Sequence, residues 1–290
     1  MVAAQLPEIV SLKLSAEELE SSVASSKTIQ EALAALYRDG IVVLSNAVDT
    51  DHIDVLNKRL MSDLPKLMKR SDLRYNQGAV TGNVAQIPPL VPEFMFKDIF
   101  ANPIAATILH HFIGPEPKVL NLTSNTAIKA SESQQIHADV SMDHPNFPYG
   151  AVVNVNLVDT RPENGSTEFW LGTPNISLPR PDPDGNLRSN CLENRKEVSP
   201  PFQPSLPKGS LIIRDIRIWH AGRPNFTDEP RAMIGLAWFA KWYESPIRMA
   251  FPESIKKIIE SWKNEVAFVV DYVSGEMDYL AYKTVNPQWG

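Results

Sequence analysis

Apolar residues in the first part of the chain recur at the spacing of amphipathic helices. Two patterns in which a serine or threonine precedes a glutamate by three residues, Ser15-x-x-Glu18 and Thr28-x-x-Glu31, are typical of capping boxes at helix starts. Gly40 is suited to end the second helix. The predicted elements are helices beginning near residues 15 and 28, a buried strand at 41–44, a helix from 49 or 51 to 67, and a short helix over 103–112.

After Lys118 the apolar period changes from that of a helix to the two-residue alternation of strands. Two stretches, 71–100 and 174–207, are rich in proline and lack periodicity, so they are interpreted as long loops and as candidates for a lid over a pocket. A closing helix is predicted to begin near Pro252. The predicted strands are Val119–Ile128, Val152–Val158, Leu211–Trp219 and Ala232–Phe239.

Helices first and strands afterwards predict a single α+β domain over residues 1–290, mainly β in content. Helices would pack outside an antiparallel sandwich or barrel. No linker in the sequence marks a second domain.

Composition narrows the classes of protein that fit this pattern. Hydrophobic residues make up 43% and charged residues 21% of the chain, which is ordinary globular usage. The single cysteine, Cys191, excludes a disulfide framework and a multi-thiolate metal site. A net charge of −6 gives no basic surface for nucleic acid, and no apolar run approaches the ~20 residues that span a bilayer. We therefore expect a cytoplasmic protein with a small-molecule partner, either a monomer or a homodimer.

Two of the six histidines are placed to bind a metal ion together with a carboxylate. In an extended chain, residues i and i+2 point the same way, so His137 and Asp139 offer an imidazole and a carboxylate to one point. His220 lies at the end of the strand predicted for 211–219. If the two segments adjoin, the three side chains form a two-histidine-one-carboxylate triad, which occupies one face of an octahedral iron(II) and leaves three positions open.

Arg231 lies eleven residues after His220, beyond a turn, and precedes the strand predicted for 232–239. A hairpin would bring it back beside the strand that carries His220. A guanidinium binds a carboxylate through two parallel hydrogen bonds, which lysine does less well. Arg231 is therefore suited to hold the far end of a dicarboxylate whose near end binds a metal.

Other interpretations of the same residues stay open. His137 on its own fits a structural histidine, and a His-x-Asp pattern arises by chance in about one chain in four of this composition. His144 is a rival ligand. Two histidines, a carboxylate and a water also suit zinc, so a non-oxidative cupin-like zinc enzyme is an alternative, as is a non-catalytic binding subunit.

Taken together, these residues resemble the phytanoyl-CoA dioxygenase family of iron(II)/2-oxoglutarate-dependent oxygenases, especially its natural-product branch. The resemblance extends over residues 28–240 and includes the segment 36–44 and the tetrapeptide Trp219-His220-Ala221-Gly222. It implies a double-stranded β-helix, a jelly roll of cupin-like type, at about 118–243. The flanking regions would be a helical part at about 1–117 and a C-terminal helical extension at about 244–290.

The resemblance also implies roles for single residues. Iron(II), 2-oxoglutarate and dioxygen would be the cofactor and co-substrates, and the metal carboxylate implies oxygen chemistry rather than halide transfer. Arg74 is the candidate for the contact to the other carboxylate of 2-oxoglutarate. Apart from the resemblance, Arg214, Arg217 and Arg223 are interpreted as surface charges without a role. The implied catalytic and metal-binding residues are His137, Asp139 and His220, and the implied 2-oxoglutarate contacts are Arg231, Gln134 and Thr167.

The activity implied is oxidation of a C–H bond of a small, largely apolar metabolite, by hydroxylation, desaturation or rearrangement, with release of succinate and carbon dioxide. Secondary-metabolite biosynthesis is the expected setting. An acyl-CoA 2-hydroxylase of phytanoyl-CoA type is the alternative within the family, although the sequence shows no basic cluster for the phosphates of the coenzyme.

Overall fold

A large sheet of eight strands dominates the computed structural model, which describes residues 8–140, 146–176, 189–246 and 248–281. The strand order is β1-β2-β7-β5-β9-β4-β11, with β3 paired to β4. The two short edge strands each pair in parallel with their neighbour, β1 with β2 and β11 with β4. Every other pairing in this sheet is antiparallel. The strands are β1 (Ser11–Leu12), β2 (Ile41–Leu44), β3 (Asn83–Gln86), β4 (Lys118–Ala127), β5 (Gly150–Asn156), β7 (Leu211–Asp215), β9 (Arg231–Phe239) and β11 (Ala267–Phe268).

A smaller sheet is built around the antiparallel pair β6 (Glu168–Trp170) and β8 (Trp219–Ala221). Isolated bridges extend it on both sides, because His137 pairs with His220 and Phe202 pairs with Phe169. A third, two-stranded sheet joins β10 (Met249–Pro252) and β12 (Val270–Val273) in parallel.

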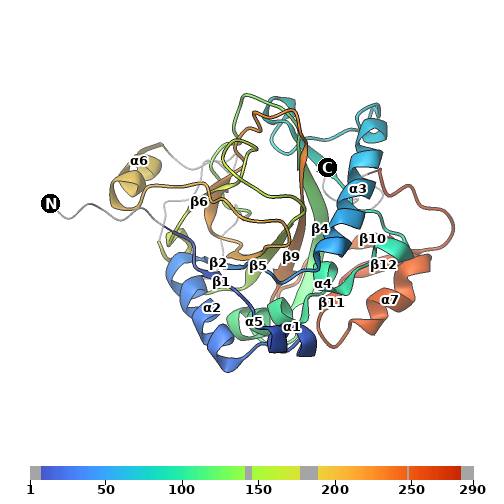
Figure 1. Ribbon diagram of the computed structural model, residues 1–290, viewed down its shortest axis with the longest axis horizontal. Helices are drawn as coiled ribbons and strands as arrows, with labels where there is room; N and C mark the ends of the chain where they lie inside the picture. The colour runs from blue at the N-terminus through green and yellow to red at the C-terminus, as the bar shows by residue number, and fades with distance from the viewer. Residues whose placement is uncertain (1–7, 141–145, 177–188, 247, 282–290) are drawn as a thin grey trace.

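Helices cover one face of the large sheet. Figure 1 shows α2 and α5, which pack on each other and on strands β2 and β5. The yellow helix α6 lies at the left edge, apart from this layer. The helices are α1 (Ala16–Ser21), α2 (Ser26–Asp39), α3 (Thr50–Leu67), α4 (Lys97–Phe100), α5 (Pro103–Ile113), α6 (Ser189–Val198) and α7 (Lys256–Ser261), with 3₁₀ turns at Ala79–Thr81, Pro92–Phe94, Thr173–Asn175 and Glu253–Ile255.

The first helices begin where short polar side chains satisfy their free N–H groups. Ser15 and Glu18 form the predicted capping box of α1, and Asp49 caps α3. The second predicted capping box is wrong, because α2 begins earlier. Its cap is Ser25, whose hydroxyl accepts from the N–H of Thr28.

The strands of the large sheet have one apolar face and one mixed face. On β9, Ile234, Leu236 and Trp238 are fully buried in the main core, which also contains buried residues of the helices. The alternate residues Met233, Gly235 and Ala237 are only half-buried. Because side chains alternate along a strand, one face of the sheet packs against the helices and the other faces the smaller sheet.

The predicted architecture, a large and mainly antiparallel sheet with helices packed around it, is confirmed, but four predicted segments are wrong in detail. The strand predicted for 211–219 is two strands in different sheets, because the chain turns at 216–218. In this turn the side chain of Asp215 accepts from the N–H of Arg217, and its carbonyl accepts from Ile218. The loop predicted for 71–100 contains β3 and α4, whose brevity hides their periodicity.

The loop predicted for 174–207 contains the helix α6, while residues 177–188 lie outside the described part. The C-terminal part contains the predicted helix, α7, but also β10, β11 and β12, which the sequence analysis did not predict. These strands are two to four residues long, too short for a clear alternation. Within the described residues, no helix is both long and apolar enough to cross a membrane.

Candidate metal centre

The strand pairing of the smaller sheet places His137 directly opposite His220. Each residue's backbone N–H donates to the other's carbonyl, at 3.0 and 2.9 Å. Opposite residues of an antiparallel pair project from the same side of the sheet, and here the ring centroids lie 4.4 Å apart. The backbone therefore fixes the two imidazoles as neighbours although 83 residues separate them in the sequence.

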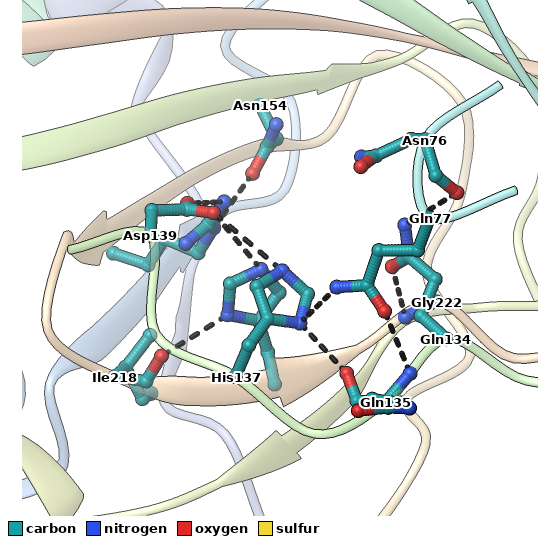
Figure 2. A network of polar contacts seen from close by, with 11 residues as sticks. Asn76, Gln77, Gln134, Gln135, His137, Asp139, Asn154, Ile218 and Gly222 are labelled. Atoms are coloured by element: carbon teal, nitrogen blue, oxygen red, sulfur yellow. Dashed lines mark hydrogen bonds and ion pairs between the residues drawn. The ribbon is translucent and has the colours of Figure 1, made fainter. Parts of the chain in front are cut away.

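Asp139 completes the cluster from two residues further along the same extended segment. Its N–H donates to the carbonyl of Ile216, which holds this segment beside the turn before β8. The Oδ1 atom of Asp139 lies 3.7 Å from Nε2 of His137 and 3.6 Å from Nε2 of His220. The three potential ligand atoms all lie within 4.8 Å of one another, and Figure 2 shows Asp139 and His137 facing each other. The structure thus brings together all three residues of the predicted triad.

Hydrogen bonds of the outer ring nitrogens orient both imidazoles. Nδ1 of His220 lies 3.0 Å from the carbonyl of Ile218, and Nδ1 of His137 lies 2.8 Å from the carbonyl of Gln135. An Nδ1–H that donates to a carbonyl leaves the lone pair on Nε2, the arrangement usual for metal-binding histidines. The amide nitrogen of Gln77 also lies 2.9 Å from Nδ1 of His137 (Figure 2), and it can donate there only in the opposite tautomer. Metal binding through Nε2 therefore selects the bond to Gln135.

The charge of Asp139 is stabilised by its surroundings. Desolvation of the carboxylate raises the pKa of Asp139, but the charge of Arg214 and its hydrogen bond to the carboxylate outweigh desolvation and hold that pKa below its usual value. Burial, and then the charge of Arg214, holds the pKa of His220 well below its usual value. Asp139 is therefore ionised and His220 neutral at pH 7, the protonation states that metal ligation requires.

Arg214 and Arg217 are buried, so their interpretation as surface charges is wrong. Nη2 of Arg214 lies 2.7 Å from Oδ2 of Asp139, and its Nε donates to Oδ1 of Asn154 at 3.1 Å. Arg217 forms a two-bond ion pair with Asp215 at the turn between β7 and β8. No sequence pattern predicts the contact between Arg214 and Asp139, because the two residues are 75 positions apart. The alternation along this strand is equally compatible with an arginine that faces solvent.

Arg223 is the third arginine of that group, and its side chain is 39% exposed, as the prediction of a surface charge requires. One of its Nη atoms lies 3.7 Å from Oε2 of Glu168.

Arg231 is almost fully buried, with 2% of its surface exposed. Its Nε donates to the carbonyl of Asn164 at 3.2 Å, and Nη2 donates to the carbonyl of Gly165 at 2.7 Å. Gly165 has φ +77°, and a Cβ there would lie 2.6 Å from the carbonyl of Arg223, so glycine is required in this turn. Burial lowers the pKa of Arg231 to about 10. No carboxylate of the described residues pairs with this buried cation.

Gln134 lies on the extended segment before His137, where its backbone N–H donates to the carbonyl of Gly222. Its side-chain oxygen accepts from the N–H of Gly222 at 2.7 Å, and its amide nitrogen is 3.4 Å from the carbonyl of Asn76 (Figure 2). A Cβ on Gly222 would lie 2.6 Å from that side-chain oxygen, so glycine permits the approach. A role of Gln134 in binding a co-substrate stays a prediction.

Thr167 directly precedes β6, whose Phe169 is paired with His220. Residues i and i+2 share a face of a strand, so Thr167 and Phe169 project to the side of the sheet that carries His220. Thr167 is half-buried. The backbone carbonyl of Arg74 accepts a hydrogen bond from the N–H of Ala85 in β3. The predicted roles of Thr167 and Arg74 also stay predictions.

The remaining histidines lie in other surroundings. His52 contacts Asp98, and His110 and His111 lie at the end of α5. The proposed rival ligand His144 lies outside the described residues. Within the described part of the chain, the triad is the one cluster of three or more histidine, cysteine or acidic side chains with metal-binding geometry.

Two imidazole nitrogens and one carboxylate oxygen that occupy one face of a metal site are the donor set of non-haem iron(II) oxygenases. The residues present fit such an ion, since the Nε2 lone pairs and Oδ1 converge and the outer atoms are hydrogen-bonded to protein groups.

Comparison with known proteins also points to a dioxygenase family. The model of the phytanoyl-CoA dioxygenase (PhyH) family matches residues 36–233. A curated relative, dioxygenase af480 of Aspergillus fumigatus, is 24% identical over 198 residues, which cover 65% of this chain. The matched region spans 60% of the length of that relative.

Two solved structures share the fold. The epimerase SnoN, crystallised with Fe³⁺, alpha ketoglutarate and nogalamycin RO, has a TM-score of 0.57 at 19% identity, covering 74% of this chain and 85% of SnoN. EctD from S. alaskensis, crystallised with 2-oxoglutarate and 5-hydroxyectoine, has a TM-score of 0.60 at 19% identity, covering 76% of this chain and 77% of EctD.

Proposed function

The chain belongs to the phytanoyl-CoA dioxygenase family, and from that premise we propose that it is an iron(II)- and 2-oxoglutarate-dependent oxygenase. The metal ligands are His137, Asp139 and His220. The substrate is a small, largely apolar metabolite of secondary metabolism, one C–H bond of which is oxidised while 2-oxoglutarate is converted to succinate and carbon dioxide.

One observation carries the proposal beyond metal binding in general. Arg231 is a buried cation without a carboxylate partner among the described residues, at the start of β9. An unpaired buried charge costs several kcal/mol, so its presence calls for an anionic ligand. The far carboxylate of 2-oxoglutarate supplies that anion, whereas a zinc hydrolase would leave Arg231 without a function.

The proposed roles of the other residues follow from their positions. The carbonyls of Asn164 and Gly165 fix the guanidinium of Arg231, so that its remaining N–H groups hold the dicarboxylate in one orientation. Thr167 and Gln134 are the further contacts proposed for this co-substrate. Bound iron and 2-oxoglutarate supply the oxidising chemistry, and the protein positions the substrate and excludes water.

We also infer the finer architecture. The large sheet and the four paired segments around His137, β8, β6 and Phe202 form the two layers of a double-stranded β-helix. The ligands lie on the smaller layer, and Arg231 opens a strand of the larger one. The half-buried residues Gly235 and Ala237 of β9 face the space between them, and their small size suits a pocket for an apolar substrate.

The SnoN structure contains nogalamycin RO and SnoN is an epimerase from nogalamycin biosynthesis, and this supports a natural-product substrate for the present chain. An acyl-CoA thioester stays the alternative substrate. Incubation with each substrate class under air, with substrate-dependent succinate measured, separates the two.

The central experiment is anaerobic absorption spectroscopy. Iron(II) and 2-oxoglutarate added to the protein should give the weak visible charge-transfer band of the chelate, and His137→Ala should abolish it. Admission of air should then give succinate in the wild-type protein. A protein that binds zinc but gives neither the band nor succinate would instead be a zinc enzyme, and one that binds no metal at all would be a binding subunit.

A further inference from the structure

Arg214 reaches the metal centre from the opposite layer of the molecule. It lies on β7 in the large sheet, and its side chain is 8% exposed. Its guanidinium is held at two points, by Oδ1 of Asn154 on the adjacent strand β5 and by Oδ2 of Asp139. Asn154 is itself buried and lies opposite Gly235, where a Cβ would be only 3.3 Å from the Asn154 amide nitrogen.

The two oxygens of Asp139 therefore have different partners. Oδ2 accepts the short charge-assisted bond from Arg214 at 2.7 Å. Oδ1 faces Nε2 of both histidines at 3.7 and 3.6 Å. Turning Oδ2 as well as Oδ1 towards the point where the two Nε2 atoms converge would draw Oδ2 away from Nη2 of Arg214.

We propose that Arg214 is a positioning residue that restricts Asp139 to binding the metal through one oxygen. The inference rests on the proposed function. An octahedral ion has six positions, of which the two histidines and one carboxylate oxygen take three. The three positions left would be available to 2-oxoglutarate and dioxygen, so a second oxygen from Asp139 would compete with these ligands.

Arginine suits this role better than lysine does. The planar fork donates to Asn154 and Asp139 at the same time, in a fixed orientation, whereas an ammonium on a flexible chain does not fix the direction of the carboxylate. The hydrogen bond to Asn154 therefore contributes to the positioning of Asp139, because it fixes the orientation of the guanidinium plane of Arg214.

The test measures access to the sixth position directly. Nitric oxide, a stand-in for dioxygen, is titrated anaerobically into the protein loaded with iron(II) and 2-oxoglutarate, and its binding is followed by electron paramagnetic resonance. We expect Arg214→Met to keep the charge-transfer band of bound 2-oxoglutarate but to bind nitric oxide at least about 10-fold more weakly. Arg214→Lys should lie between Met and wild type.

Arg217→Lys is the matched control. It makes the same replacement as Arg214→Lys at a buried arginine three residues away, whose side-chain hydrogen bonds both go to Asp215, so it should leave nitric oxide affinity unchanged. If Arg214→Met does not fold, Asn154→Ala tests the same device, because the loosened guanidinium should weaken nitric oxide binding about 3-fold.

The proposal is overturned if folded Arg214→Met, or Asn154→Ala in its place, binds nitric oxide as tightly as wild type. Equal weakening in Arg217→Lys would also overturn it, since the effect would then be one of general stability. Absence of the charge-transfer band in the wild-type protein would contradict the proposed function itself, and is thereby distinguishable from failure of the role of Arg214.

Discussion

The two faces of the large sheet differ in what they pack against, although the same strands supply both. On the helix-facing side, β9 presents Ile234, Leu236 and Trp238, each at most 1% exposed. On the opposite side the same strand begins with Arg231 and continues with half-buried residues. One face can therefore be close-packed for stability, while the other keeps charged groups and space for ligands.

The contrast extends to polar groups. The face of the large sheet opposite the helices is its inner face, and the helix-facing side is its outer face. Arg214 on β7 and Asn154 on β5 are buried on the inner face, where Arg214 donates hydrogen bonds to Asn154 and to Asp139. Their immediate neighbours Ile213 and Val153 belong to the apolar core on the outer face. Alternate residues along one strand thus serve stability on one face and activity on the other. Substitutions at the metal centre and on each face of the sheet test that separation, and one in α1 gives a reference far from both faces.

The largest effect is expected from the metal centre. His137→Ala should lower 2-oxoglutarate turnover at least about 1000-fold, because loss of a ligand removes metal chemistry worth several kcal/mol. The free energy of unfolding without metal should change by about 1 kcal/mol or less, since the residue is only partly buried. Succinate assays and urea unfolding measure the two quantities. Turnover at the wild-type rate would disprove the ligand assignment.

A helix-facing residue should show the reverse. Leu236→Ala is expected to lower the free energy of unfolding by about 2–5 kcal/mol, because it leaves a cavity in the main core. Turnover per folded molecule at low temperature should persist. Urea unfolding measures the loss, and Met233→Ala, on the inner face of the same strand, is the control variant. Equal losses for the two variants would contradict the division of the faces.

Arg231→Met should raise the KM for 2-oxoglutarate about 100-fold, because it removes the partner of a buried carboxylate. The effect on kcat should be smaller, and Arg231→Lys should lie between. Steady-state kinetics at varied 2-oxoglutarate measures this. An unchanged KM would show that another group holds the co-substrate.

The smallest effect is expected far from both faces, at the capping box of α1. A side-chain hydrogen bond from Thr28, followed by backbone N–H groups of Ser15 and Ser25, lowers the pKa of Glu18 to about 2. Because the folded-state pKa is lowered, the stabilisation is complete above the unfolded value of about 4.5 and is lost as the pH falls towards 2.

Glu18→Gln should therefore cost about 1 kcal/mol at pH 7, and the difference from wild type should shrink below pH 4.5. Urea unfolding at pH 7 and pH 3.5 checks the sign. A difference that grows on acidification would exclude the carboxylate as its source.

Much of the fold could be predicted from periodicity, because alternation persists through long strands. The range predicted for β4 is within one residue of the observed range, and β9 gains only Arg231. The break between β7 and β8 could not be predicted, since Ile216 and Ile218 continue the apolar pattern through a turn that depends on Asp215.

The triad was predictable because two of its members lie two residues apart and local geometry already places them on one side. Arg214 was not, because nothing near it in the sequence distinguishes an arginine that reaches a distant carboxylate from one in solvent. Burial of a charge is decided by its partner, and partners from different strands are not visible in a linear pattern.

The turn at 216–218 links the layers so closely that Arg214 and His220 lie only six residues apart yet approach Asp139 from different sheets. The ion pair between Arg214 and Asp139 therefore couples one metal ligand to the distance between the layers, although all three ligands lie on the same layer. Hydrostatic pressure, which compresses that gap, should shift the absorption of the loaded centre well before the protein unfolds.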